Sequence, residues 1–493
     1  MATPTGTYKS EKPTAISGFL RYFYGNFIVL ILGFISIPLI TRVMSTEEYG
    51  RSGMFTSAVT IIYIFAILGM DQTYIRYYYK EGIDRKRLLK RCLYPAFGIV
   101  LGLSFIYLFC ADYANEFLFG KNSVDICILV VGYTIISVFE RFLFLDIRMS
   151  QNGKLYSNLN ILSKVLYIAL IFVAFWFLGD DFRVVLIAMT VSLGIVTFGI
   201  GIRYIIKNKK DDTIYDISLQ PSSSELIKYG MPFILVLLME WLLSTCDKWS
   251  LRMWSGYAEL GIYNSAMNIM SILLTFKATF VAFWSPVAME KYETSDADEN
   301  REFFKNAFNV TRFLCIIAAI GLILFRRLIV YILGSGYRDA ASIIPFLTLM
   351  PIFSIMFEIT NQGIKFVKKN RYLNYASAVA IVCNIGGNAL LVPRFGGAGA
   401  AVATGITYMA YFAIGSYFAE KCYYVGYENI KTFVYAVVLM GYAYLATFVD
   451  KMALDIIFGI FSMLLVCVID YKVLKNCLSY IVETINRLFN KND

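Results

Sequence analysis

The sequence predicts an all-α polytopic membrane protein of about 14 transmembrane helices, in two parallel six-helix lobes followed by two extra C-terminal helices. Three observations favour this fold class: the composition, the recurrence of long apolar segments, and an internal repeat. Of the 493 residues, 58% are hydrophobic and only 16% are charged, whereas about a quarter of the residues in a soluble protein are charged. The composition therefore excludes an ordinary soluble protein of this length.

Apolar segments of about 20 residues, long enough to cross roughly 30 Å of hydrocarbon as helices, recur along the whole chain. Asp247 and Lys248 end the seventh segment. We interpret these two residues as an ion pair at the outer mouth of the protein or as solvated charges. We expect fourteen spans, at 18–42, 53–79, 92–111, 124–146, 155–178, 184–206, 229–246, 258–284, 304–325, 341–364, 372–392, 398–419, 432–449 and 454–472.

Lysine and arginine are unevenly distributed between the two sets of loops. The loops on the side of the N-terminus hold 28 of the 45 basic residues, and the loops on the opposite side hold 11. Because basic loops remain in the cytoplasm, we expect both termini to lie there. Membrane orientation thus explains the net charge of +10, and no nucleic-acid partner is expected.

The residue types present exclude several catalytic chemistries. The chain contains no histidine, so Ser-His-Asp triads and His-ligated metal sites cannot form. The nine cysteines form no C-x-x-C pair, and the chain has no nucleotide-binding or nucleophile motif. We therefore expect no cofactor, no metal site and no enzymatic activity.

Six basic residues fall within the predicted spans, each in the cytoplasmic half of its helix. An ionised side chain in hydrocarbon costs at least a few kcal/mol, so such residues usually face a bundle interior or a wet cavity. Arg21, Arg76 and Arg141 are close enough to the inner boundary to reach the lipid headgroups instead. The candidate cleft cations and substrate-binding residues are Arg21, Arg76, Lys277, Arg141, Lys164 and Arg312.

Acidic residues are fewer within the spans. They are candidates for structural ion pairs with the basic residues or for ion coupling. Because they cannot neutralise all six cations, we expect a net positive interior. These acidic residues are Asp71, Glu140, Glu240 and Glu358.

An internal repeat relates the two halves of the chain. The segment STEEYGRSGMFTSA at 45–58 resembles SGYAELGIYNSA at 255–266, with an offset of 211 residues. The same offset places spans three to six onto spans nine to twelve, and an even number of spans makes the two copies parallel. We expect an N-terminal lobe at 1–206, a cytoplasmic linker at 207–228, a C-terminal lobe at 229–421, and spans thirteen and fourteen with a tail at 422–493.

Several segments of the chain resemble the polysaccharide (O-antigen type) flippases of the multidrug/oligosaccharidyl-lipid/polysaccharide (MOP) exporter superfamily. The segments are FISIPLITRVMSTEEYG (34–50), LIKYGMPFILVLLMEWLLSTCDKWSL (226–251), ELGIYNSAMNI (259–269), FWSP (283–286), YILGSGYRDAASIIPFL (331–347) and PRFGGAGAAVAT (393–404). Together they extend over most of the chain up to residue 420, and the last two spans contribute little.

The resemblance implies a fold like that of the multidrug (MATE) exporters, with a V-shaped central cleft between the lobes. It implies transport of an undecaprenyl-pyrophosphate-linked oligosaccharide from the inner to the outer leaflet of the bacterial cytoplasmic membrane. In such relatives, basic residues of helices one, two, seven and eight hold the pyrophosphate, which implies this role for Arg21, Arg76 and Lys277. Span seven departs from the pattern because it offers only Glu240. Membrane lipids, a polysaccharide polymerase and a chain-length regulator are the further partners implied.

Other functions remain open at this point. A peptidoglycan-precursor flippase or a multidrug exporter would share the fold, although an exporter of cationic drugs would favour an acidic interior. A membrane glycan polymerase or ligase is a candidate of another class, but such enzymes usually have a longer external loop than any in this chain.

Overall fold

The computed structural model describes residues 15–207, 221–476 and 479, and every described element is helical. The side chains of residues 15–24, 26 and 205–207 lie outside the description. The N-terminal half contains α1 (Ala15–Val43), α2 (Thr46–Ile67), α3 (Met70–Tyr77), α4 (Arg85–Phe109), α5 (Ala111–Phe119), α6 (Val124–Met149), α7 (Gly153–Leu178) and α8 (Arg183–Lys207). The C-terminal half contains α9 (Ser223–Trp254), α10 (Tyr257–Thr294), α11 (Ala297–Leu324), α12 (Arg326–Val330), α13 (Ala340–Thr360), α14 (Gln362–Phe366), α15 (Arg371–Cys422), α16 (Asn429–Tyr444) and α17 (Met452–Ile469).

These helices provide fourteen membrane crossings within the described ranges. Twelve are long and apolar enough by themselves, and the described side chains of α1 add a shorter apolar helix, Phe27–Val43. The 52 residues of α15 would make a straight helix of about 78 Å at 1.5 Å per residue, far longer than one crossing. Gly396 has non-helical angles (φ 52°, ψ −130°) and divides α15 into two spans. The predicted all-helical membrane protein of about 14 spans is confirmed.

Two predicted spans have different ends in the structure. The second is divided, because Leu68 and Gly69 both have positive φ (52° and 65°) and separate α2 from the short helix α3. The seventh does not stop at residue 246, because α9 continues to Trp254. The interpretation of Asp247 as an outer-mouth or solvated charge was wrong, since its side chain is buried in the protein and hydrogen-bonded there.

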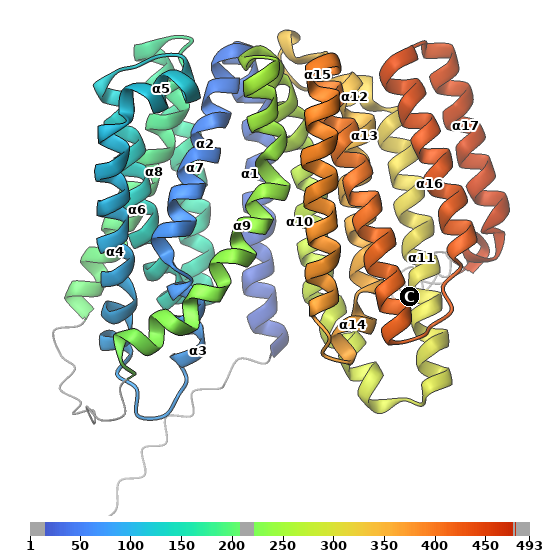
Figure 1. Ribbon diagram of the computed structural model, residues 1–493, viewed down its shortest axis with the longest axis horizontal. Helices are drawn as coiled ribbons and strands as arrows, with labels where there is room; N and C mark the ends of the chain where they lie inside the picture. Colours follow the sequence, from blue (N-terminus) through green and yellow to red (C-terminus); the bar gives the residue numbers. More distant parts are fainter. Residues whose placement is uncertain (1–14, 208–220, 477–478, 480–493) are drawn as a thin grey trace, which may run out of the picture.

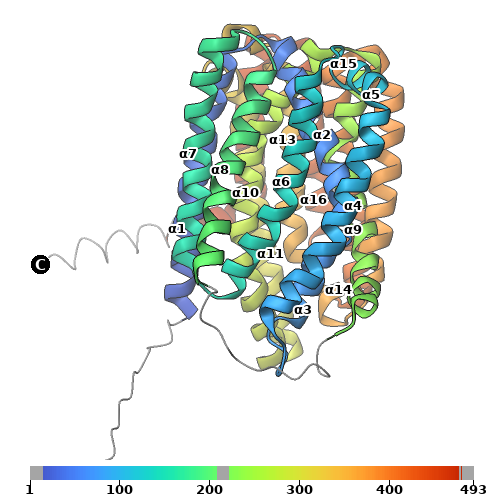
Figure 2. The same ribbon diagram turned by 90° about the vertical axis from the view of Figure 1, so that its left-hand side faces the viewer.

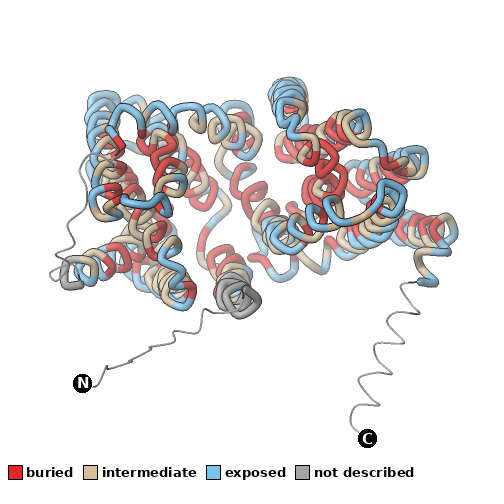
Figure 3. Tube along the Cα trace, turned by 90° about the horizontal axis from the view of Figure 1, so that it is seen from below, coloured by how far each residue is buried: buried red, intermediate tan, exposed pale blue. Residues whose placement is uncertain are grey.

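The helices form two groups that lie side by side (Figures 1 and 2). One group contains α1 to α8 and the other contains α10 to α17, while α9 runs obliquely between them. At its lower end α9 contacts the first group, where Thr73 of α3 donates a hydrogen bond to the carbonyl of Leu226 (3.2 Å). Viewed from below, each group has buried residues in its own interior (Figure 3).

The two groups meet at the upper end of Figure 1 through a crossing of α2 and α10. Gly50 lies against the carbonyl of Tyr257, and Gly261 lies against the carbonyl of Thr46, so closely that a Cβ on either glycine would overlap the opposite backbone. The offset of 211 residues relates Thr46 to Tyr257 and Gly50 to Gly261. The internal repeat therefore forms a symmetric small-residue crossing, of the kind that lets helix backbones approach in membranes.

The glutamate of the repeated segment also has the same role in both copies. Glu48 accepts a hydrogen bond from the backbone N–H of Phe182 (2.9 Å), just before α8. Glu259 accepts one from the N–H of Gly397 (2.8 Å), at the start of the second half of α15. In each copy, the carboxylate accepts a hydrogen bond from a backbone N–H that has no partner within the helix, at the beginning of the sixth span. Its negative charge is also attracted to the positive end of the dipole of that helix.

We predict that Gly50→Leu or Gly261→Leu forces the upper ends of α2 and α10 apart, because the added side chain occupies the place of the opposite backbone. Spin labels at positions 47 and 258 of a cysteine-free protein should then report a population at longer distance by electron paramagnetic resonance. Gly102→Leu is the matched control, since nothing lies within 4 Å of a Cβ at that position. An unchanged distance distribution in both crossing variants would contradict the prediction.

Candidate functional site

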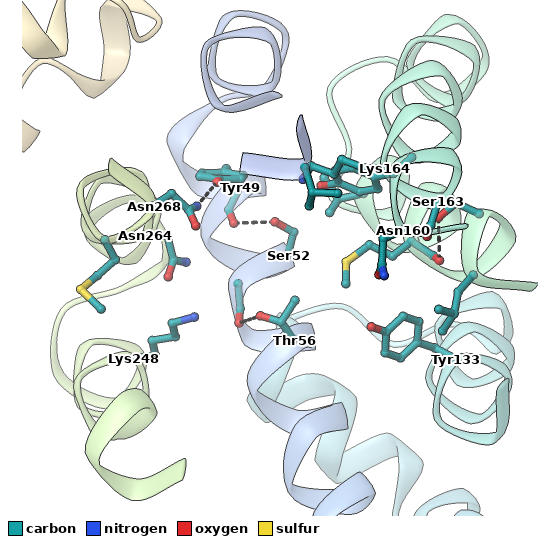
Figure 4. Close-up of a pocket in the computed structure, with 18 residues that line it drawn as sticks. Tyr49, Ser52, Thr56, Tyr133, Asn160, Ser163, Lys164, Lys248, Asn264 and Asn268 are labelled. Carbon is teal, nitrogen blue, oxygen red and sulfur yellow. Dashed lines mark hydrogen bonds between the residues drawn. The ribbon is translucent and has the colours of Figure 1, made fainter. Parts of the chain in front are cut away.

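A cavity of about 430 Å³ lies below the crossing, lined by side chains of both helix groups. Residues of α2 and α10 that follow the crossing by one or two turns reach it, together with residues of α6, α7 and α9 (Figure 4). Its lining contains many polar side chains, among them Tyr49, Ser52, Thr56, Tyr133, Asn160, Ser163, Lys164, Lys248, Asn264 and Asn268. We call it the head cavity.

A second cavity of about 890 Å³ adjoins the first, between α1 and α10. Large apolar side chains such as Phe27, Phe34 and Phe276 line it, and more than a third of the surface of each of these three is exposed. Five side chains line both cavities, so the two spaces are continuous: Val29, Tyr49, Lys164, Tyr167 and Asn268. We call the second one the apolar chamber.

The head cavity has a positive charge that no acid neutralises. Lys164 and Lys248 line it, and none of its lining residues is Asp or Glu. Neither lysine has a carboxylate within 4.0 Å among the described side chains, and Lys164 instead lies 4.7 Å from the ring centroid of Tyr167. Two ammonium groups in a membrane-embedded cavity attract an anionic ligand.

Asp247 precedes Lys248 but serves a different function in the structure. Only 2% of its surface is exposed, and its carboxylate accepts hydrogen bonds from the hydroxyls of Tyr263 and Thr404 (2.5 and 2.6 Å) and from the amides of Asn388 and Asn384 (2.7 and 3.3 Å). All four donors are neutral, and no basic nitrogen of the described part lies within 4.0 Å. A buried carboxylate of this kind can take up a proton or a small cation. No group of three or more cysteine or acidic side chains in the described ranges could hold a metal ion.

Three of the six predicted cleft cations are paired with acids. Arg141 of α6 contacts Asp71 of α3 (2.6 Å), and Lys277 of α10 contacts Glu358 of α13 (3.0 Å). These contacts favour the alternative of structural ion pairs over free substrate-binding groups.

Arg312 does not reach either cavity. It is fully buried between α11, α16 and the end of α17, where Glu428 and Asp470 each lie 3.1 Å away. In this conformation its contacts are those of a structural ion pair. The two acids that neutralise it lie just before α16 and just after α17.

The other predicted charges are placed as follows. Arg76 is exposed on α3, near the lower end of the protein, and lines neither cavity. The backbone of Arg21 belongs to α1, but its side chain lies outside the described residues. Glu140 is half-buried and Glu240 is exposed, and neither has an ion pair among the described side chains. Of the five predicted cations whose side chains the structure describes, only Lys164 lines the head cavity.

Lys248 is the cavity cation that the sequence does not predict. An Asp-Lys pair after an apolar segment indicates the end of a span, which places both residues outside the membrane. The apolar residues Trp249, Leu251, Met253 and Trp254 that follow are the signal that the helix continues.

The helix arrangement and the cavity between the two groups define a membrane transporter with the fold of the MOP superfamily. The chain resembles the lipid II flippase MurJ in an inward closed conformation, with a TM-score of 0.66 and 17% identity over 92% of this chain and 99% of that chain. It also resembles an outward-facing multidrug resistance MATE family transporter of the MOP superfamily, with a TM-score of 0.54 and 16% identity over 85% and 96% of the two chains. A third structure is a MOP superfamily transporter from Pyrococcus furiosus described as having a binding pocket of reverse polarity, with a TM-score of 0.55 and 16% identity over 82% and 95%.

Residues 16–291, more than half of the chain, match the family described as "Polysaccharide biosynthesis protein". The chain belongs to this family. It is a multi-pass membrane transporter of polysaccharide biosynthesis, in a family that is generally non-enzymatic. Comparison with curated protein sequences gives no match.

We predict that Arg312→Met and Lys248→Met have opposite effects on stability. The first leaves Asp470 buried without its main basic partner, which costs about 3–5 kcal/mol. The second removes an ammonium group that has no acidic partner within 4.0 Å, so the free energy of unfolding should stay the same or rise. Thermal unfolding of the purified protein in detergent measures both, and a lower midpoint for Lys248→Met would show that this lysine has a structural partner.

Proposed function

We propose that this protein moves an undecaprenyl-pyrophosphate-linked oligosaccharide from the inner to the outer leaflet of the bacterial cytoplasmic membrane, by alternating access. The observation that carries the proposal is the head cavity, where two lysines without acidic partners lie next to an apolar chamber. The substrate has the matching parts: an anionic pyrophosphate, a polar saccharide and an apolar tail.

Lys164 supports the position of the pyrophosphate because it lines both cavities. A phosphate at this point receives charge-assisted hydrogen bonds from one lysine and attraction from the second. The first isoprene units of the tail then occupy the apolar chamber between α1 and α10, and the saccharide enters the head cavity. These interactions compensate for the water that the pyrophosphate loses when it enters the protein.

The alternating movement requires two lobes that separate at one end at a time. We take the predicted lobes at 1–206 and 229–421 as the moving parts. Of the predicted linker at 207–228, residues 208–220 lie outside the description and α9 already begins at Ser223. The α2–α10 crossing closes the upper end in this conformation. With both termini in the cytoplasm, that end faces the outside, so the head cavity is reached from the inner leaflet. Opening of the crossing releases the headgroup to the outer leaflet.

The lysines also discriminate between the alternative functions. A cation-exporting multidrug transporter needs acidic groups in its cavity, and the head cavity has none. The substrate of a peptidoglycan-precursor flippase also contains a pyrophosphate. Only transport assays with defined substrates distinguish that function from the proposed one. A glycan polymerase or ligase would leave exported but unlinked repeat units in a deletion strain, whereas loss of a flippase retains them in the inner leaflet. A polysaccharide polymerase and a chain-length regulator are the partner proteins that this function would require.

We predict that Lys164→Gln and Lys248→Gln each lower transport about tenfold or more, because each variant loses a charged hydrogen-bond donor or a nearby charge. The measurement is leaflet-resolved transport of extracted lipid-linked glycan in proteoliposomes. Lys154→Gln is the matched control, since Lys154 is exposed on the same helix, α7, and lines neither cavity. Lys→Arg variants should retain part of the rate. Normal transport by the double variant Lys164→Gln/Lys248→Gln would overturn the proposed function of the cavity.

A further inference from the structure

The head cavity contains a group that a pyrophosphate cannot satisfy. Asn264 of α10 is only 5% exposed and lines the cavity, yet its amide nitrogen and its amide oxygen both lack a hydrogen-bond partner within the described part of the chain. By contrast, the amide of Asn268, one turn further along α10, donates to the hydroxyl of Tyr49 (2.6 Å). Both Asn264 atoms have almost no accessible surface in this closed conformation, so a ligand reaches them only when α10 moves away from α2. A buried polar group without a partner is destabilising, so a ligand that pairs with this amide favours such a movement.

The position of Asn264 is made possible by a glycine on the opposite helix. Gly53 of α2 lies directly against the Asn264 amide, and a Cβ at residue 53 would overlap its nitrogen. The offset of 211 residues makes Gly53 and Asn264 equivalent positions of the internal repeat. The second copy therefore has an amide side chain, Asn264, where the first copy has a glycine without a side chain, Gly53. One turn earlier the two copies are identical, since Gly50 and Gly261 occupy equivalent positions.

The unpaired atoms of Asn264 define the chemistry of its ligand. The amide nitrogen needs an acceptor and the amide oxygen needs a donor. An ionised pyrophosphate offers acceptors only, and an isoprenoid tail offers neither. A sugar ring has adjacent hydroxyl or acetamido groups that provide a donor and an acceptor together.

Beside its lysines, the surrounding wall also contains neutral hydrogen-bonding groups. Tyr133 and Asn160 line the cavity on the side of the first helix group. The amide nitrogen of Asn160 donates to the backbone carbonyl of Tyr156 (2.9 Å), which leaves its oxygen as an acceptor. At about 430 Å³, the cavity is near the lower limit of about 300 Å³ for ligand pockets, so it has room for roughly one sugar ring beside the phosphates.

We propose that Asn264 is a specificity-determining residue that hydrogen-bonds the first sugar of the lipid-linked substrate, the sugar attached to the pyrophosphate. This inference rests on the proposed function and adds to it a division of roles. The two lysines bind the charge common to all such lipids, and Asn264 distinguishes the lipid that carries a sugar from the lipid that does not. The sugars beyond the first lie outside the head cavity.

The test compares two ligands by isothermal titration to the purified protein in lipid nanodiscs. One is the lipid-linked glycan extracted from a strain that accumulates it, and the other is polyprenyl pyrophosphate without sugar. The wild-type protein should bind the glycan-bearing lipid about tenfold more tightly, as expected for one or two additional hydrogen bonds. Asn264→Leu and Asn264→Ala should abolish this preference while the affinity for the bare lipid stays unchanged. Trimming the glycan enzymatically to its first sugar should leave the wild-type preference intact.

The control variant is Asn374→Leu, which replaces an exposed asparagine of α15 that lines neither cavity and should keep the preference. Lys248→Gln should lower the affinity for both lipids by the same factor. If both Asn264 variants keep the full preference while Lys248→Gln weakens both lipids, the sugar subsite is overturned and the proposed function stands. If the wild-type protein binds neither lipid, the proposed function itself fails.

Discussion

The structure depends on the energetic cost of a basic side chain, an ammonium or a guanidinium group, inside a membrane protein. Such a group must be paired with an acid, reach the lipid headgroups, or lie in a cavity that holds water or an anion. Arg141, Lys277 and Arg312 follow the first route, each with a carboxylate on a neighbouring helix. Lys164 and Lys248 follow the third. The separation of paired from unpaired cations therefore distinguishes the residues that hold helices together from the residues that we propose bind a ligand.

The paired cations also account for the attachment of the last two spans. Arg312 joins α11 to Glu428 and Asp470 near the lower end, and Arg326 joins α12 to Asp450 and Asp455 near the upper end (2.8 and 2.5 Å). Hydrophobic burial cannot distinguish helix contact from lipid contact, so buried ion pairs are effective in fixing which helices are neighbours. The spans outside the internal repeat are thus fixed at both ends to the C-terminal half.

The span count and the internal repeat were predictable from the sequence, because both depend on local apolar length and on a short segment that occurs twice. The end of α9 could not be predicted in this way, because the hydrogen-bond partners of Asp247 are more than 130 residues away in the chain. These partners are Asn384, Asn388 and Thr404. Without them, an Asp-Lys pair after apolar residues resembles the end of a span. The same limit applies to the cations. Their burial could be inferred from span position, but whether Lys277 meets Glu358 or an empty cavity depends on helix packing.

In the proposed function, the positions that the two copies of the repeat share serve movement, and the positions at which they differ serve selectivity. The glycine and glutamate positions that the two copies share form a closure in which each half makes the same contacts, and equal contacts can be made and broken together. One turn further on, Gly53 and Asn264 differ and lie against each other. A ligand that hydrogen-bonds Asn264 therefore interacts with the residue that lies against α2 immediately below the closure. In the proposed mechanism, a single helix crossing thus connects binding of the headgroup with opening of the upper end, without a longer path through the protein.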